Sequence, residues 1–331
     1  MWKQKYYKLY FNDNNDLMDN VNASLLKYEN FPKSLFKYMK AEYAITSLGD
    51  DYIKVSTPFD ANDPFEGELF FDYDLLSKEY MDDLLIKQLD DTIFNLTKND
   101  KELIINDQNP LNKLIEILYE NKFFISEGLS FNEFKKIFTK GYNDYGHFTV
   151  KNFNKVLKKQ IIFVSLSESN NITPLWAHYA DDNKGVCIEY DLSSSEDFFL
   201  DEPCHPICYV EQANYTEEIN QLQNDNRNKL KLLEEPFLKK SIDWSYEKEW
   251  RVLINKTQLK ATMDLLKKHD IIQRRNGMCF IKFPKPTSVF LGLNISETYE
   301  IKIKEICRKR DILVYKMVKD ENGYNLNYIQ I

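Results

Sequence analysis

The chain of 331 residues contains 43% hydrophobic and 14% aromatic residues, which is enough to build a core and excludes a chain that is disordered throughout. It has 9 glycines against 22 phenylalanines and 21 tyrosines, so the composition disfavours a glycine-rich loop that binds phosphate. The formal net charge of −8 disfavours a nucleic-acid-binding protein that works by broad neutralisation of phosphates.

The cysteines and the hydropathy pattern indicate the compartment. The five cysteines form an odd, low-density set without the spacing of a secreted disulfide scaffold. Residues 1–16 lack the apolar run of a signal peptide, and no stretch of about 18 apolar residues occurs in the sequence. We therefore expect a soluble, cytoplasmic protein with no membrane partner, and its oligomeric state is left open.

The first half of the chain changes character twice. Residues 1–34 are polar and aromatic, and we expect an N-terminal extension there. The run 52–57 predicts a strand that ends at Pro58. From about 70 to 160 the apolar residues recur with helical spacing, as at Leu111, Leu114, Ile115, Leu118 and Tyr119. This spacing predicts a helical insertion.

The second half is rich in short apolar runs typical of strands. They predict strands at 161–167, 184–191, 204–210, 249–254, 278–283, 288–293, 312–318 and 324–331. Helices are expected at about 216–242, at about 257–269 and after Ser296, which is a good N-cap residue. The order contains too few βαβ units for a doubly wound sheet. We predict a single α+β domain over 35–331, with a mixed or antiparallel sheet core and the helical insertion at about 70–160.

The loop Asn62-Asp63-Pro64-Phe65-Glu66 is the first segment that could carry chemistry. An aspartate before proline favours an extended backbone, and proline fixes the next φ, so a structured turn explains the loop without any function. Its two acidic groups could also hold a ribose or a cation. The pattern leaves both interpretations open.

A second polar segment runs from Ser165 to Ala180. Ser165 and Ser167 point to the same side of the predicted strand 161–167. Thr173 and Pro174 then suit the N-cap and the first position of a short helix. On that helix His178 and Tyr179 share one face with Leu175, and Trp176 lies one step around. A lone histidine beside aromatic residues is explained equally well by packing and by function.

The third segment is Tyr246-Glu247-Lys248-Glu249-Trp250-Arg251. If the strand includes all six residues, alternation places Glu247, Glu249 and Arg251 on one face. The two carboxylates would then be about 6–7 Å apart at the backbone. That spacing allows one carboxylate to contact a sugar hydroxyl while the other orients a nucleophile. A structural Glu–Arg pair on a sheet face is the alternative.

Metal and nucleotide motifs are weak or missing in the sequence. Cys204, His205 and Cys208 supply ligand types for zinc, but no second Cys/His pair completes a site, so we predict no metal site. The sequence contains no Walker motif, no GxGxxG and no HExxH.

In this order, the segments resemble a widespread bacterial family known as domain of unknown function 2971, whose members read LYKY, FNDPFE, SLS, LWxHYAxxHxG and late YxxExEWR. The matching residues here are LFKY at 35–38, ANDPFE at 61–66, SLS at 165–167, LWAHYADDNKG at 175–185, VCIEY at 186–190 and YEKEWR at 246–251. Asn183 departs from the pattern, because a histidine is common at that position in the family.

The arrangement is also similar to ADP-ribosyltransferase-like enzymes, which bind NAD through three separated strand elements. This resemblance implies an ADP-ribosyltransferase-like fold, NAD as substrate, and an acceptor that could be nucleic acid or protein, as in a toxin or an anti-phage effector. It assigns Glu249 as the catalytic carboxylate, whereas Glu247 would position the acceptor. The residues implied for NAD binding are Lys37, Tyr38, Ser56, Asn62, Asp63, Phe65, Ser165, Ser167, Trp176, His178, Tyr179 and Arg251.

Two other functions are left open by the sequence. The three segments could form the packed polar core of a non-catalytic ligand-sensing or interaction module. Alternatively, Asp63, Glu66 and Glu249 could hold Mg²⁺ in a nuclease, because such sites need no fixed short motif. Any single-site hypothesis requires Lys37, Ser56, His178 and Glu249 to line one cleft.

Overall fold

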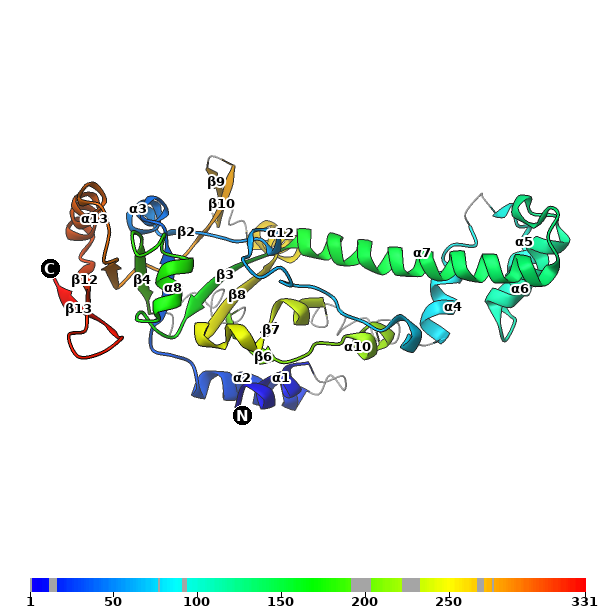
Figure 1. Ribbon diagram of the computed structural model, residues 1–331, viewed down its shortest axis with the longest axis horizontal. Helices are drawn as coiled ribbons and strands as arrows, with labels where there is room; N and C mark the ends of the chain where they lie inside the picture. Colours follow the sequence, from blue (N-terminus) through cyan, green and yellow to red (C-terminus); the bar gives the residue numbers. More distant parts are fainter. Residues whose placement is uncertain are drawn as a thin grey trace. The chain divides into compact units, whose positions relative to one another are not determined.

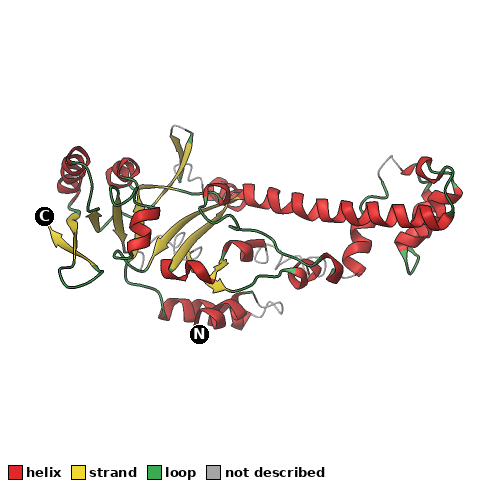
Figure 2. Cartoon of the chain, in the orientation of Figure 1, coloured by secondary structure: helices red, strands yellow, loops and turns green. Residues whose placement is uncertain are grey.

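The computed structural model (Figures 1 and 2) describes residues 2–11, 17–76, 78–90, 94–191, 204–221, 233–266, 271–275 and 277–331. The chain divides into two compact units. The first is formed from the described residues within Met1–Glu68, Leu157–Gln212 and Leu233–Ile331, and the second from those within Leu69–Val156 and Ala213–Leu232. The expected helical insertion therefore corresponds to most of the second unit.

A large sheet is the centre of the first unit. Its described strands lie in the order β13 (Leu326–Gln330), β12 (Leu313–Lys319), β11 (Ser288–Leu291), β4 (Val186–Tyr190), β1 (Leu35–Met39), β3 (Ile161–Ser167), β8 (Glu249–Asn255) and β5 (Cys204–Pro206). Neighbouring strands are antiparallel, except that β11 and β12 are parallel and are joined by helix α13 (Glu297–Arg310), which is capped by Ser296. The α+β class with a mixed sheet is confirmed.

Two small sheets complete the strands that the structure describes. One contains β2 (Tyr52–Lys54), β10 (Met278–Lys282) and β9 (Ile272–Arg275), and the other contains β6 (Cys208–Val210) and β7 (Lys239–Ser241). The single strand expected at 204–210 is thus wrong, since its halves β5 and β6 belong to different sheets. Pro206 has no N–H to continue the β5 ladder, and the chain turns to pair with β7.

One face of the large sheet is covered by helices and forms the main core. Alternate residues of β3 and β8, such as Val164 and Val252, point into it. Helices α3 (Ala41–Asp50), α12 (Lys256–Leu266) and α13 bury apolar side chains against them. On the other face the short helix α8 (Thr173–His178) packs Leu175 and Trp176 against β1 and β4. On this second face, the end of β3 and the facing start of β8 carry polar residues that are available for a site, namely Ser165, Ser167, Glu249 and Arg251, whereas the opposite ends of the two strands are apolar.

The expected N-terminal extension is part of the first unit. It forms α1 (Trp2–Tyr10) and α2 (Leu17–Glu29). Tyr6 and Tyr7 are buried beside Phe237, and the single O–H of Tyr7 is shared between the carbonyls of Pro206 (2.5 Å) and Leu238 (3.2 Å). The aromatic composition of residues 2–11 is therefore explained by packing on β5, β6 and their connections.

The second unit is helical. It contains α4 (Lys78–Ile86), α5 (Lys98–Ile105), α6 (Pro110–Glu120), α10 (Thr216–Gln221) and most of α7 (Phe131–Gln160), whose last four residues belong to the first unit. Leu85, Leu114 and Phe134 are among its buried core residues. In the part of the chain that the structure describes, no helix combines the length and the apolar character needed to cross a membrane.

Two expected helices differ from the structure. The helix expected at 216–242 begins as α10, but residues 235–241 contain the 3-10 helix η5 (Glu235–Phe237) and strand β7 instead. Pro236 removes an N–H donor there, and the pairing of β7 with β6 overrides the loose leucine spacing. Residues 222–232 with Leu222 and Leu230, and residues 267–270 of the helix expected at 257–269, lie outside the described part of the chain.

Polar groups just before the NDPFE loop and within it fix the backbone of this segment. Thr57 donates to the Asp60 carboxylate (2.7 Å) in a capping box around the 3-10 helix η1 (Pro58–Asp60). Asp63 is buried and accepts the Phe65 N–H (2.9 Å). Gly67 then adopts φ +61°, with the Phe237 ring where a Cβ would lie. The loop therefore closes through a residue that must be glycine for two reasons, and this closure sets the position of Glu66.

We expect Gly67→Ala to lower the free energy of unfolding by about 2–5 kcal/mol, from left-handed strain and overpacking together. A Cβ there would lie 2.2 Å from Phe237 Cε1. Gly277→Ala is the matched control: φ is +78° and nothing lies within 4 Å, so about 1–2 kcal/mol of strain is expected. Urea unfolding of both variants measures this, and equal losses would contradict the packing role of Gly67.

Candidate functional site

The site lies where the large sheet opens between β1 and β3. Among the described residues these two strands pair at one position, Phe36 with Ser167, whereas β3 pairs with β8 along its whole length. Farther along, the edge of β3 is taken by Ser56, which exchanges two backbone hydrogen bonds with Phe163 (2.8 and 2.9 Å). Between these two contacts the Lys37 side chain enters the gap, and its Nζ donates to the Ser165 carbonyl (2.9 Å). The divergence of two adjacent strands thus creates an opening in the sheet.

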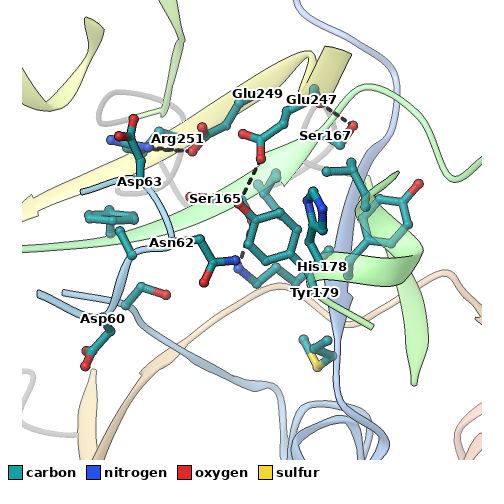
Figure 3. A pocket seen from close by; sticks show the side chains of 18 of the residues that line it. Asp60, Asn62, Asp63, Ser165, Ser167, His178, Tyr179, Glu247, Glu249 and Arg251 are labelled. Carbon is teal, nitrogen blue, oxygen red and sulfur yellow. Dashed lines mark hydrogen bonds and ion pairs between the residues drawn. The ribbon is translucent and has the colours of Figure 1, made fainter. Parts of the chain in front are cut away.

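A cavity of about 300 Å³ occupies this opening (Figure 3). That volume is at the lower end of the range for small-molecule sites. The residues implied by the sequence that line it are Lys37, Tyr38, Ser56, Asn62, Asp63, Ser165, Ser167, His178, Tyr179, Glu247, Glu249 and Arg251. Lys37, Ser56, His178 and Glu249 therefore do share one cavity, although they come from four separate segments.

Two of the implied residues lie elsewhere. The Phe65 side chain is 61% exposed and does not line the cavity. The Trp176 side chain, on α8, is fully buried. Its indole N–H donates to the Asn170 carbonyl (2.8 Å), and its ring packs edge-on against Tyr38. The NDPFE and LWAHYA motifs thus each contain one aromatic residue that does not face a ligand in this cavity.

Arg251 is the centre of the polar network at one end of the cavity. Its guanidinium is buried and binds Glu66 through two hydrogen bonds, Nη1 to Oε1 (2.6 Å) and Nη2 to Oε2 (3.1 Å). It also binds Glu249 Oε1 through Nε (2.9 Å), donates to the Phe237 carbonyl (2.5 Å) and stacks on the Phe163 ring. Burial alone would lower the pKa of Arg251, but Glu249 and Glu66 raise it above its ordinary value. Arg251 is therefore a fixed cation.

Glu249 is held as an anion by its neighbours. Burial alone would raise the pKa of its carboxyl, but Arg251, Lys240 and the Ser165 hydroxyl together lower that pKa to about 2. The Lys240 ammonium lies 3.3 Å from Oε2. Figure 3 shows the Glu249 side chain directed toward Arg251. The negative charge of Glu249 is thus balanced by two cations of the protein itself, Lys240 and Arg251.

Glu247 has a different environment, although it is only two residues away. It accepts hydrogen bonds from Tyr179 (2.8 Å, to Oε1) and from Lys240 (2.6 Å, to Oε2). Burial and the nearby Glu249 charge raise the pKa of Glu247, and Lys240 and Tyr179 lower it only in part. In Figure 3 its carboxylate points toward Tyr179, across the cavity from Asp60. Glu247 is therefore held as an anion less firmly than Glu249.

The expected strand alternation of the YEKEWR segment is wrong for its first residues. Glu247 ends the 3-10 helix η6 (Ile242–Glu247), Lys248 is left-handed (φ 47°), and β8 begins at Glu249. The register then places Glu249 opposite Ser167 and Arg251 opposite Ser165. The left-handed turn, rather than the pleat of a strand, brings both carboxylates into one cavity.

Several other predicted residues have structural partners. The Ser167 hydroxyl donates to the Glu247 carbonyl (2.7 Å), and the Tyr38 hydroxyl donates to the Ser169 carbonyl (2.9 Å). Thr173 is not the helix cap, because α8 starts at Thr173 with Ile172 in the cap position. His178 is exposed at the cavity edge, with its Nδ1 3.5 Å from the Tyr246 hydroxyl. These contacts fix the shape of the cavity.

Lysines surround the opening on the side of β1 and β2. Lys37, Lys40 and Lys54 all line the cavity, and in the described chain none of them forms an ion pair with a carboxylate. Burial lowers the pKa of Lys37 to about 8, and the nearby Lys54 charge adds to this effect against the pull of Glu249. Lys54 lies over the Tyr43 ring (4.2 Å). This side of the cavity therefore has positive charge that the protein itself does not neutralise.

Sequence reasoning missed Lys240, Lys54, Lys40 and Tyr43. Lys240 bridges Glu247 and Glu249 from strand β7, and its own pKa is raised by these two carboxylates despite burial. It belongs to a stretch that looked helical, so no signal pointed to it. Lys54 could have been found, because it lies within the predicted strand 52–57, two residues before Ser56 and therefore on the same face.

The residues considered for metal binding are engaged in other contacts. Among the described side chains no group of three or more His, Cys, Asp or Glu residues is arranged to hold a metal ion. The carboxylates that a magnesium-dependent nuclease would use, Glu66 and Glu249, both bind Arg251. His205 is buried and its Nδ1 lies 2.7 Å from the Tyr6 hydroxyl.

The depressed pKa of Glu249 predicts a loss of stability in acid. Its stabilising effect is complete above the ordinary pKa of 4.5 and is lost as the pH falls through about 2. Over that interval the wild type should lose on the order of 3 kcal/mol more stability than Glu249→Gln, which has no such group to protonate. Urea unfolding at half-unit steps of pH provides the measurement.

The matched control is Glu102→Gln, because Glu102 is exposed and lies 4.0 Å from Lys98 on α5. Its unfolding curve should keep the pH dependence of the wild type. If the Glu249→Gln curve has the wild-type slope between pH 4.5 and 2, the assignment of Glu249 as a buried anion is wrong.

Comparison with known proteins gives one match, and it covers part of the site. No curated protein and no solved structure matches the chain. Residues 175–252 match the model of a family described as Protein of unknown function (DUF2971). The matched span runs from α8 to β8 and contains Tyr179, Lys240, Glu247, Glu249 and Arg251, whereas Lys37 and the NDPFE loop lie outside it. Over this span of α8 to β8, the chain is similar to the family of proteins of unknown function DUF2971.

Proposed function

We propose that the cavity is the active site of an ADP-ribosyltransferase-like enzyme that uses NAD as substrate. The observation that carries this proposal is the separation of charge within the cavity. Lys37, Lys40 and Lys54 line one side and form no ion pair with a carboxylate of the described residues, and the pair Glu247 and Glu249 lines another. A dinucleotide has the complementary arrangement, since its pyrophosphate is anionic and its riboses carry hydroxyl groups.

The lysine side suits the pyrophosphate. Lysine ammonium groups bind phosphate oxygens as point charges through charge-assisted hydrogen bonds. Lys37 loses much of its hydration in the sheet opening, which is why burial lowers its pKa to about 8. An anion beside Lys37 would restore the favourable environment of the charged amine. We therefore expect NAD binding to take up protons above pH 8, where free Lys37 is largely neutral.

The carboxylate side suits the ribose next to the nicotinamide. In ADP-ribosyl transfer the bond between ribose C1′ and the nicotinamide nitrogen breaks, and both electrons leave with the nicotinamide. The positive charge that develops on the ribose is stabilised by a fixed negative charge nearby. Tyr179 lies beside Glu247 and lines the cavity, so its ring can stack on a planar ligand.

The topology agrees with an ADP-ribosyltransferase-like fold of this kind. Lys37 on β1, Ser165 and Ser167 on β3, and Glu249 on β8 come from three adjacent strands of one mixed sheet. In the order that the resemblance implies, the serine-containing element is Ser56-Thr57, and Ser56 joins the sheet through its bridge to Phe163 of β3. A protein that consumes NAD would deplete the cell that makes it, which fits a toxin or an anti-phage effector acting on nucleic acid or protein.

A second candidate function is a non-catalytic module that binds a nucleotide. The observation in its favour is that Arg251 and Lys240 already neutralise Glu249, the carboxylate that the resemblance makes catalytic. In such a module the network would hold the cavity in shape, and the ligand would leave unchanged. NAD turnover separates the two functions.

We expect NAD to raise the melting temperature of the wild type and to be converted with release of nicotinamide. Lys37→Met and Lys54→Met should each weaken NAD binding about tenfold, because each removes a charge-assisted hydrogen bond. Calorimetric titration measures affinity, and chromatography measures nicotinamide. Lys285→Met, at an exposed position outside the cavity, is the control. Binding without turnover would favour the non-catalytic module, and no binding would refute the proposal.

A further inference from the structure

The carboxylates of Glu247 and Glu249 differ in how many of their acceptor positions are occupied. A carboxylate offers about four lone-pair directions. Glu249 receives Arg251 Nε (2.9 Å) and Nη2 (2.8 Å) at Oε1, Lys240 at Oε2 (3.3 Å), and a hydrogen bond from the Ser165 hydroxyl. Its capacity is therefore full before any ligand binds.

Glu247 has acceptor capacity left over. Each of its oxygens has one partner: the Tyr179 hydroxyl on Oε1 (2.8 Å) and the Lys240 ammonium on Oε2 (2.6 Å). One lone-pair direction per oxygen remains for a substrate hydroxyl. Figure 3 shows that the side chain points into the space bordered by Tyr179 and Asn62, while Glu249 points away toward Arg251.

Lys240 connects the two groups and is itself fixed. Its ammonium touches both Oε2 atoms, and it lies 4.7 Å from the centre of the Trp244 ring. Glu249 therefore holds Lys240 in the position from which it donates to Glu247. A change at Glu249 would act on Glu247 through this lysine, which makes Lys240 and Glu249 positioning residues.

We infer that Glu247 is the catalytic carboxylate of this cavity, and that Glu249 is a buried anion that positions Lys240 and Arg251. This reverses the roles that the resemblance assigns to the two glutamates, and the reaction itself rests on the proposed function. The opposite pKa shifts of the pair agree with the assignment, since a general base near neutral pH needs a raised pKa and a fixed anion needs a lowered one.

Ionised Glu247 accepts a hydrogen bond from a ribose hydroxyl while the bond from C1′ to nicotinamide breaks and its electron pair leaves with the nicotinamide. The acceptor, a hydroxyl or amine of the target or a water molecule, then bonds to C1′. Its proton passes to Glu247, and solvent takes that proton before the next cycle. The groups around Glu247 that bear on its charge are Tyr179, Lys240, Glu249, Tyr246, Tyr209 and Lys37.

The test compares Glu247→Gln with Glu249→Gln in nicotinamide release from NAD and in thermal unfolding. We expect Glu247→Gln to lower kcat about 10²- to 10⁴-fold, the usual contribution of a general base, with a melting temperature within about 2 °C of the wild type. Glu249→Gln should lower the melting temperature by about 5 °C or more, because Arg251 and Lys240 lose their shared anion.

A third variant tests the positioning role of Lys240. Lys240→Met removes the cation that lowers the pKa of Glu247, so the acid limb of the kcat/KM profile should shift to higher pH. A lysine that acted only through packing would change the amplitude of the profile and leave its midpoint in place. An unshifted midpoint would therefore overturn the positioning role.

Nicotinamide release by the wild type tests the proposed function, and the comparison of the two variants tests the roles of Glu247 and Glu249. If the wild type releases nicotinamide and Glu247→Gln keeps at least a third of that rate, the inference fails while the proposed function stands. If the wild type releases none, the proposed function fails, and thermal unfolding still tests the two roles. Glu247→Gln melting as low as Glu249→Gln, or lower, would show that Glu247 is structural and would overturn the inference.

Discussion

The first unit depends on the buried guanidinium of Arg251. It joins the distant Glu66, at the end of the NDPFE loop, to two nearer partners, the Phe237 carbonyl of η5 and Glu249 at the start of β8. A buried cation with these partners is strongly destabilising when one of them is lost, because the remaining charge is left without compensation. Gly67 packs directly on Phe237, so the backbone of the loop and the position of the guanidinium are coupled.

This network also explains why the sheet can be open beside it. Separating β1 from β3 forgoes ladder hydrogen bonds, which are unfavourable to leave unmade in a buried place. Lys37 restores one of them by donating to the Ser165 carbonyl, and Ser56 restores others at Phe163. On the far side of β3, pairing with β8 continues without interruption from Ile161 to Ser167. The opening is therefore a local feature supported by rigid neighbours, as a binding cavity requires.

Sequence patterns predicted the strands well where hydrophobic runs were short and bounded, as at 161–167, and failed where long-range pairing decided the structure. The strand break at Pro206 and the strand β7 in place of a helix depend on partners about 30 residues away. The residues of the candidate site were found where motifs marked them. Lys240 was missed because its function comes from contacts with Glu247 and Glu249 rather than from any local pattern.

The Glu-x-Glu motif does not specify the backbone conformation of the residue between its two glutamates. On a regular strand the two carboxylates would share a face and an environment. Here the left-handed Lys248 ends a 3-10 helix at Glu247 and starts a strand at Glu249, so the first glutamate approaches from the η6 side and the second from within the sheet. The Glu247 carboxylate accepts hydrogen bonds from the Tyr179 hydroxyl and from Lys240, and the Glu249 carboxylate accepts one from the Arg251 guanidinium. One backbone conformation at Lys248 thus gives two chemically identical side chains opposite charge behaviour. The position of a glutamate in the motif therefore says less about its role than the number of cations that bind it.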